Sequence, residues 1–434
     1  MTAFVKVGSE FRVDTPGGGA SSCPSVSALP SGGFVVGWSE NIANAHHPGG
    51  PDIKARLYSS SGRANGPEFF INRETFDYQQ DPSLAALPNG GFVAVWQDFS
   101  GRGEDTCGSG IKARVFGPRG EIIRNEFLVN EETKDSQTNP AVAVLSHGGF
   151  VVAWQDFSGT RGDDSLSSVK ARIFNSDGSP CSEEFLVNTH TYDNQMRPSI
   201  AALSGGGFVV VWNDFSKTLG DFCSGSIKAK VFEGTGETVA EELLVNNRKW
   251  NNQNLPAVSA LESGGFAVAW TDASRSMGDS SATSIKARLF DDQGRPITVE
   301  FLVNSETLNT QIRPSVASLT DGGFVVAWVD YSGRGGDASA SGIKAKVFTS
   351  DAEVVNDEFL VNTETIGEQI DPTATGLTDG SFVVCWQDRG ISSQEAKLSA
   401  IKGQIFGRAK VDSNDLPVSY PELSFRPSER ANDS

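Results

Sequence analysis

The sequence GGFVVAWQDFSGTRGDDSLSSVKARIF occupies residues 148–174 and recurs in similar form six more times along the 434-residue chain. It joins an apolar run that ends in Trp-x-Asp to a polar, Gly-bearing loop, and then to a second strand-like run. The tryptophans of this motif are 58 residues apart without one insertion or deletion: Trp38, Trp96, Trp154, Trp212, Trp270, Trp328 and Trp386. A fixed period of this kind indicates an array of equal structural units.

Each period contains four strand-like segments. Residues 137–188 show them in order as PAVAVL, FVVAWQD, SVKARIF and EEFLVN, separated by turns such as SHGG and NSDGS. Gly, Asn and Asp supply the positive φ angles that tight turns require. Four antiparallel strands per repeat are typical of one blade of a β-propeller, with the tryptophans packed between neighbouring blades.

The two ends of the repeat region favour a closed ring over a linear stack. The fourth-strand motif EFLVN, or a variant of it, begins near residues 68, 126, 184, 242, 300 and 358, and an extra copy, EFRVD, lies at residues 10–14. The last repeat runs through AIKGQIF at residues 400–406 and then lacks the motif. We therefore predict an all-β, seven-bladed β-propeller over residues 1–410, whose N-terminal strand completes the last blade and removes unpaired edges. Residues 411–434, rich in Pro, Ser and charge, are predicted to form a loosely attached tail.

Composition narrows the range of partners. The formal net charge is −18, and an acidic surface repels nucleic acid and anionic lipid. No stretch of about 18 apolar residues is present, so we expect no membrane insertion.

The opening MTAFVKVGSEFRVD is typical of a strand and not of a signal peptide, which permits a cytoplasmic location. The five cysteines have neither metal-ligand nor disulfide-framework spacing, which predicts reduced thiols, and we expect a monomer.

Antiparallel strands alternate in direction, so the loops after the tryptophans (such as residues 157–167) and the links into the next blade (such as residues 189–194) share one face of the disc. We call this face the link face. Two acidic positions recur in its loops, at Asp98 and Asp105, Asp156 and Asp163, Asp214 and Asp221, Asp272 and Asp279, and Asp330 and Asp337. Carboxylates on a flexible Gly-bearing loop suit Ca²⁺. The alternative, which we favour, is that the first Asp folds the loop and pairs with the lysine of the IKAR motif, as Asp98 would with Lys112.

A glutamine three residues before proline also lies on the link face, at the entry to each inner strand: Gln79, Gln137, Gln195, Gln253, Gln311 and Gln369. Six amides near the channel mouth are candidate hydrogen-bond partners for a ligand. The alternative, again favoured, is that each amide secures the link between blades, because buried amides satisfy backbone groups first.

A catalytic site needs unlike groups with matched roles, so departures from the repeat are candidates of another kind. The first blade carries Glu40, His46 and His47 in its loop, and the last blade carries Glu395. The link from the fourth to the fifth blade inserts Arg248, Lys249 and Trp250, and His190 lies in another link. A tryptophan beside Arg and Lys suits stacking against a sugar or an aromatic group. The alternative, which we slightly favour, is ordinary loop variation in which Trp250 covers an apolar patch.

The composite pattern Q-x-x-P-x-V-A-x-L-x-x-G-G-F-V-V-x-W-x-D, followed by I-K-A-R-x-F and E-F-L-V-N, resembles repeats of large secreted bacterial proteins of the haemolysin-type calcium-binding and adhesin-like classes. The resemblance covers residues 4–406. It implies an extracellular recognition or adhesion module, although this chain lacks the Gly-Gly-x-Gly-x-Asp arrays that many such proteins contain.

Three functions are compatible with this sequence. We expect a non-catalytic propeller that binds a carbohydrate or a protein partner on the link face, with Ca²⁺ as a candidate cofactor. The first alternative is an enzyme acting on a polysaccharide or an ester, using Glu40, His46, His47 and Glu395 at the channel mouth. The second alternative is an intracellular scaffold. Fold alone does not choose among them.

Overall fold

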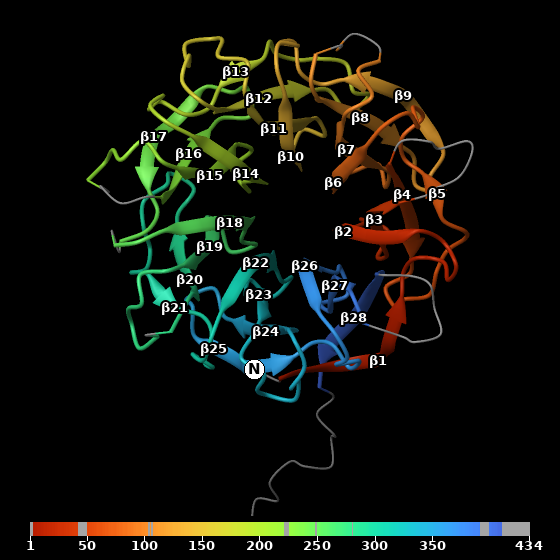
Figure 1. Ribbon diagram of the computed structural model, residues 1–434, viewed down its shortest axis with the longest axis vertical. Coiled ribbons are helices and arrows are strands. Elements are labelled where there is room, and N and C mark those ends of the chain that lie inside the picture. The colour runs from red at the N-terminus through yellow and green to blue at the C-terminus, as the bar shows by residue number, and fades with distance from the viewer. Residues whose placement is uncertain are drawn as a thin grey trace, which may run out of the picture.

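The computed structural model describes residues 3–41, 50–102, 105, 107–220, 225–247, 250–279, 281–390 and 399–409. Seven four-stranded antiparallel sheets surround a central opening like the blades of a propeller (Figure 1). The part of the chain that the structure describes contains no helix, and so none that spans a membrane. The predicted seven-bladed β-propeller is confirmed, while the predicted tail at residues 411–434 lies outside the described residues.

The strands follow the sequence order from the centre of the disc to its rim. The inner strands are β2 (Ala20–Ala28), β6 (Gln79–Ala86), β10 (Gln137–Val144), β14 (Gln195–Ala202), β18 (Gln253–Ala260), β22 (Gln311–Ser318) and β26 (Gln369–Gly376). The second strands are β3 (Phe34–Asn41), β7 (Phe92–Asp98), β11 (Phe150–Asp156), β15 (Phe208–Asp214), β19 (Phe266–Asp272), β23 (Phe324–Asp330) and β27 (Phe382–Asp388).

The third strands are β4 (Pro51–Tyr58), β8 (Gly110–Phe116), β12 (Ser168–Phe174), β16 (Ser226–Phe232), β20 (Ser284–Phe290), β24 (Gly342–Phe348) and β28 (Ala400–Arg408). The outer strands are β5 (Phe69–Phe70), β9 (Ile122–Leu128), β13 (Phe185–Leu186), β17 (Thr238–Leu244), β21 (Phe301–Leu302), β25 (Val354–Leu360) and, for the last blade, β1 (Phe4–Arg12).

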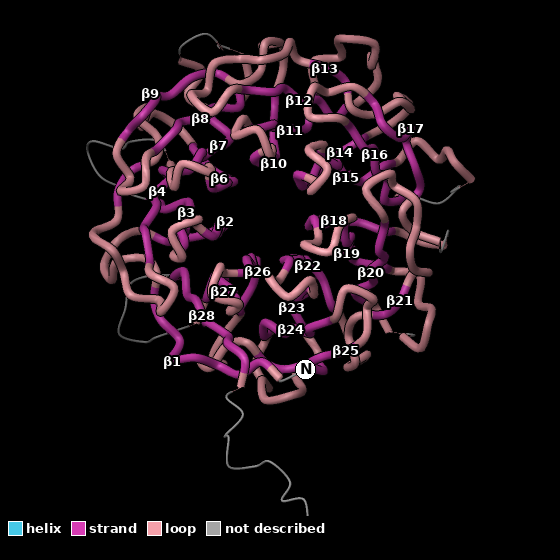
Figure 2. The backbone as a smooth tube through the Cα atoms, turned by 180° about the vertical axis from the view of Figure 1, so that it is seen from behind, coloured by secondary structure: helices cyan, strands magenta, loops and turns pink. Residues whose placement is uncertain are grey.

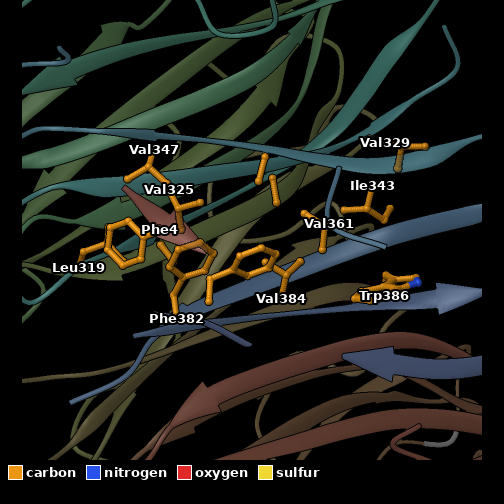
Figure 3. Packing of buried hydrophobic residues seen from close by; sticks show 14 of the residues in the cluster. Phe4, Leu319, Val325, Val329, Ile343, Val347, Val361, Phe382, Val384 and Trp386 are labelled. Carbon is orange, nitrogen blue, oxygen red and sulfur yellow. The ribbon is translucent and has the colours of Figure 1, made fainter. Parts of the chain in front are cut away.

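The core lies between blades and not within them. All seven repeat tryptophans are 0% exposed, and each hydrophobic cluster joins strands of adjacent blades. In the cluster of Figure 3, Phe382 of β27 lies near Val325 and Leu319 from the preceding blade, and Trp386 of β27 lies near Ile343 and Val361 from that blade. The second strands are buried on both faces, which explains their nearly continuous apolar sequences.

The ring closes through the N-terminal strand, as predicted. Strand β1 pairs antiparallel with β28, and Phe4 lies opposite Arg408 in the register; Figure 2 shows the two strands together from behind. Phe4 also enters the inter-blade core, where its ring centroid lies 5.2 Å from that of Phe382. The strand that closes the ring is therefore held by backbone pairing and by apolar packing.

Truncation of Phe4 tests this closure. We expect Phe4→Ala to lower the free energy of unfolding by about 3–5 kcal/mol, because a buried aromatic side chain is lost from the inter-blade core. Val5→Ala, on the same strand at a side chain that is 47% exposed, is the matched control and is expected to change it by about 0.5 kcal/mol or less. Urea denaturation measures both, and equal effects of the two substitutions would contradict the inferred role of Phe4.

Candidate functional site at the mouth of the central channel

A buried lysine in the third strand of every blade bridges two carboxylates. One carboxylate belongs to the acidic residue two positions after the tryptophan, and the other to the glutamate of the outer strand. In the third blade, Lys170 Nζ lies 3.0 Å from Asp156 and 3.0 Å from Glu184, and all three side chains are 0% exposed. The other six bridges are Glu40–Lys54–Glu68, Asp98–Lys112–Glu126, Asp214–Lys228–Glu242, Asp272–Lys286–Glu300, Asp330–Lys344–Glu358 and Asp388–Lys402–Glu10. The expected pairing of Asp98 with Lys112 is confirmed.

The second acidic position of each loop also has protein partners. Asp163 Oδ2 accepts a hydrogen bond from the amide of Asn188 at 3.0 Å, and Asp163 Oδ1 accepts one from the backbone of Ser165. Equivalent bonds hold Asp105, Asp279 and Asp337, whereas Asp221 lies outside the described residues. Among the described residues, no three His, Cys, Asp or Glu side chains are close enough together to hold a metal ion. Calcium binding by these loops stays a prediction.

The repeated glutamines secure the links between blades. All six side chains are 0% exposed. The Gln253 amide donates to the carbonyl of Trp250 at 2.9 Å and accepts from Asn246 at 3.3 Å. The other five glutamines make the same pair of contacts. Their amides are thus engaged inside the protein, in agreement with the alternative to ligand binding.

The residues that break the repeat are not brought together into one cluster. Glu40 is 1% exposed and accepts from the Trp38 indole at 3.1 Å, so it belongs to the buried bridge of the first blade and not to an open site. His190 Nδ1 lies 2.6 Å from Glu242, and Trp250 is 72% exposed on the link face. His46, His47, Arg248, Lys249 and Glu395 lie outside the described residues.

A different repeat position lines the central channel. It is the residue immediately before the proline of each inner strand: Cys23, Asp81, Asn139, Arg197, Leu255, Arg313 and Asp371. We call these seven residues the pre-proline ring. Together with the prolines they surround a cavity of about 570 Å³ at the centre of the disc. The ring contains two carboxylates, two guanidinium groups, an amide and a thiol, so it is the point at which the repeat becomes chemically asymmetric.

A β-bulge turns each ring residue toward the channel. In the second blade the register shifts between Gln80 and Ser83, and Asp81 adopts a φ of 54°. All seven ring residues have φ between 50° and 56°, a left-handed conformation that is costly for residues other than glycine and more so before proline. Because Leu255 shares it with the charged members, the bulge belongs to the architecture and not to one reaction. Bulges of this kind re-aim a side chain out of its strand.

The residue after the tryptophan holds two of the ring positions from the preceding blade. The backbone N–H of Leu255 donates to the side chain of Asn213 at 2.9 Å, and that of Arg313 donates to the side chain of Thr271 at 3.2 Å. Both acceptors lie on second strands that are themselves buried. These two ring positions are therefore pre-organised by the neighbouring blade.

The charged members of the ring differ in their surroundings. The Arg313 guanidinium forms an ion pair with Asp371. Burial raises the pKa of the Asp81 carboxyl above its ordinary value, while the neighbouring Cys23 thiol and the guanidinium groups of Arg197 and Arg313 act in the opposite direction. Burial and the adjacent Asp81 raise the pKa of the Cys23 thiol to about 12, which leaves it an unreactive hydrogen-bond donor.

A second cavity of about 460 Å³ adjoins the ring on the side of the sixth, last and first blades. It shares Cys23, Arg313 and Asp371 with the central cavity and extends to Arg389 and Glu368. These last two residues form an ion pair at 3.3 Å. The site therefore extends from the channel toward the link face on this side.

The ring was missed in the sequence because the motif Q-x-x-P was interpreted through its proline, present in all seven repeats, and its glutamine, present in six. The signal was present at the variable position between them. The acidic position two residues after the tryptophan is Asp in six of the seven repeats. The pre-proline position, by contrast, holds five different residue types in seven repeats. Its orientation toward the channel depends on the bulge, which the sequence pattern does not reveal.

No protein-family model matches this sequence, and no curated protein matches it. A protein of unknown function from Dyadobacter fermentans has a similar structure, with a TM-score of 0.55, 12% identity, and coverage of 94% of this chain and 100% of that one. A fungal alcohol oxidase of the AA5 family, in complex with copper, has a TM-score of 0.52 at 11% identity and covers 93% of this chain and 76% of its own.

An α-L-arabinofuranosidase from Fusarium graminearum, in complex with an iminosugar inhibitor, has a TM-score of 0.51 at 10% identity, with 93% of this chain and 98% of that one covered. At these identities the likeness shows the fold alone. It supports the propeller that the resemblance to secreted bacterial repeats implied, but none of the three structures is described as a haemolysin-type or adhesin-like protein.

Replacing the buried lysine tests the bridge that shapes the link face. We expect Lys170→Met to lower the free energy of unfolding by about 3–5 kcal/mol, because it leaves two buried carboxylates without their cation. Lys217→Met, at an exposed position in a neighbouring loop, is the control and is expected to stay within about 0.5 kcal/mol of the wild type. Chemical denaturation at pH 7 measures both, and a stable Lys170→Met protein would show that the bridge is not required.

The pKa of Asp81 has a consequence for stability. A carboxyl whose pKa is raised by folding contributes stability below its unfolded pKa, and this contribution is lost as the pH rises through the folded-state value. Asp81→Asn stays neutral, so its stability relative to the wild type should increase from pH 3 to pH 7. Asp177→Asn should change in the opposite direction, because hydrogen bonds from Ser179 lower the pKa of Asp177. Melting temperatures across this pH range test both signs, and a parallel response would contradict the assignment.

Proposed function

We propose that this protein acts on a carbohydrate, which it binds in the cavity of the pre-proline ring and hydrolyses at a glycosidic bond. The observation that carries the proposal is the gathering of Asp81, Asp371, Arg197 and Arg313 around one cavity of about 570 Å³. A sugar presents hydroxyl groups that both donate and accept hydrogen bonds, and charged side chains are strong partners for such groups.

The two carboxyl groups differ in the way that glycosidic hydrolysis needs. One carboxylic acid protonates the leaving oxygen while a second, negatively charged carboxylate acts on the opposite side of the bond. Asp81 is the candidate acid, since burial raises its pKa and so favours the protonated form. Asp371, paired with Arg313, is the candidate for the second carboxylate.

The enzymes among the proteins of similar structure add support of a weaker kind. The arabinofuranosidase from Fusarium graminearum is described in complex with an iminosugar inhibitor. A propeller of this shape is thus compatible with a sugar-processing site. The residues of that site are not transferable to this chain at 10% identity.

A second candidate function is carbohydrate binding without hydrolysis. It is favoured by the partners that the two carboxyl groups already have, because Asp81 is hydrogen-bonded to Cys23 and Asp371 is ion-paired. A carboxyl group engaged with the protein is less free to exchange a proton with a ligand. Both candidate functions use the same cavity. They differ in whether the bound carbohydrate is hydrolysed or released unchanged.

One set of measurements distinguishes them. A panel of oligosaccharides is assayed for binding by calorimetry and for hydrolysis by release of reducing ends. We expect hydrolysis by the wild type and a loss of about 10²–10⁴-fold in kcat for Asp81→Asn, the contribution typical of a general acid, with the dissociation constant little changed.

Asp164→Asn, in a link-face loop outside the ring, is the matched control and should retain full activity. Binding without turnover would establish the second candidate instead. Binding that Asp81→Asn, Asp371→Asn and Arg313→Gln all leave unaffected would show that the ring is not the site.

A further inference from the structure

Arg197 is the cation of the pre-proline ring that makes no direct contact with a carboxylate, although its charge acts to lower the pKa of the Asp81 carboxyl. Its side chain is exposed toward the cavity, and among the described residues its guanidinium forms no ion pair and no hydrogen bond. The other two arginines around the cavities differ in this respect. Arg313 is paired with Asp371, and Arg389 is paired with Glu368 at 3.3 Å.

The position of Arg197 is fixed even though its charge is unpaired. It lies at a φ of 54° between Gln195, which is buried, and Pro198. The backbone therefore presents the side chain toward the channel in every blade, whatever residue occupies the position. An unpaired guanidinium on a pre-organised backbone is suited to a ligand and contributes nothing evident to the fold.

Arg197 also lies across the channel from the wider part of the site. It belongs to β14 in the fourth blade, and the adjoining cavity is lined by the sixth, last and first blades, near β22, β26 and β2 (Figure 1). A ligand that contacts Arg197 at one end can thus pass over the ring and reach Asp371 and Cys23 at the other. The site favours an elongated ligand over a single small ion.

Residues of the ring and of the adjoining links suit a sugar. Asn139 and Leu255 are the neighbours of Arg197 in the ring, on either side. Tyr192 and Trp250 lie in the links that enter the fourth and fifth blades, and each is 72% exposed. Exposed aromatic rings provide flat surfaces for the apolar face of a sugar. The backbone carbonyl of each accepts a hydrogen bond from the buried glutamine that begins the next inner strand, so the backbone of both links is anchored to these strands.

We propose that the carbohydrate bound by this site is acidic, and that its carboxylate is held by the guanidinium of Arg197. The inference rests on the proposed function and specifies its substrate class. The planar guanidinium offers two parallel N–H groups to a carboxylate, a geometry that a neutral hydroxyl group does not match. An acidic saccharide supplies the anion that Arg197 lacks, while Asp81 and Asp371 remain available to the rest of the ligand.

The test compares acidic sugars with neutral forms of the same sugars. Trisaccharides of galacturonic, glucuronic and mannuronic acid, and their methyl esters, are titrated against the wild-type protein by calorimetry. We expect at least one acid to bind about 10–100-fold more tightly than its ester, the difference expected for a hydrogen bond to a charged group. Arg197→Gln should abolish this preference, because it should weaken binding of the acid by about 10–100-fold more than binding of its ester.

Two further variants sharpen the test. Arg197→Lys keeps the positive charge but loses the two parallel N–H groups of the guanidinium. It should therefore retain only part of the preference for the acid over its ester. Arg275→Gln removes an exposed arginine from a link-face loop outside the ring and should retain all of it, which controls for the change in net charge. Circular dichroism and melting temperature confirm that each variant is folded.

The outcomes separate this inference from the proposed function. Equal binding of acid and ester by the wild type, or an unchanged preference in Arg197→Gln, would overturn the role of Arg197 and leave a neutral carbohydrate as the ligand. Binding of neutral oligosaccharides from the earlier panel, without binding of any acidic trisaccharide, would do the same. Failure of every saccharide to bind would overturn both proposals.

Discussion

The architecture of the link face depends on the buried lysine of each third strand. Lys170 Nζ lies 3.0 Å from a carboxylate oxygen of Asp156, at the end of β11, and 3.0 Å from one of Glu184, in the segment of the outer strand. Glu184 in turn accepts a hydrogen bond from the backbone N–H of Glu131, in the preceding link, at 2.8 Å. One lysine thus connects a loop, an outer strand and the link between two blades. Because a buried cation needs such partners, the most regular carboxylates of the link face are committed to structure. The function must be carried by residues that the bridge leaves free.

The same interaction joins the two ends of the described chain. Glu10 of β1 lies 2.9 Å from Lys402 of β28, and it also accepts from the backbone of Thr363 at 2.6 Å. The N-terminal strand therefore reproduces the contacts of every other outer strand, although it is separated by nearly the whole sequence from the blade that it completes. A closed ring of equal blades places seven equivalent side chains around one axis. Chemical asymmetry at that axis arises only from substitutions within the ring of equivalent positions.

These contacts explain which features the sequence could predict. The period of 58 residues and the displaced EFRVD motif were sufficient for the number of blades and for their closure, because both follow from repetition. The pairing of Asp98 with Lys112 followed from the need of a buried lysine for a partner. The pre-proline ring could not be predicted from the sequence. The alternation of residues along a strand does not locate a bulge, and it is the bulge that turns one side chain toward the channel. Glu40 and His190 depart from the repeat and were therefore candidate site residues in the sequence. In the structure, Glu40 pairs with Lys54 in the bridge of the first blade, and His190 contacts Glu242 in the bridge of the fourth.

A net charge of −18 opposes the approach of an acidic ligand over long distances. Charges on the surface are screened beyond about 8 Å at physiological ionic strength, however, whereas groups that line a cavity interact at close range with little water between them. Within the pre-proline ring the two arginines balance the two aspartates, and burial favours the protonated form of Asp81. The local potential is then set by Arg197 more than by the distant carboxylates. Since those carboxylates are held by lysines, the acidic surface and an arginine that binds a carboxylate at the central cavity are compatible in one molecule.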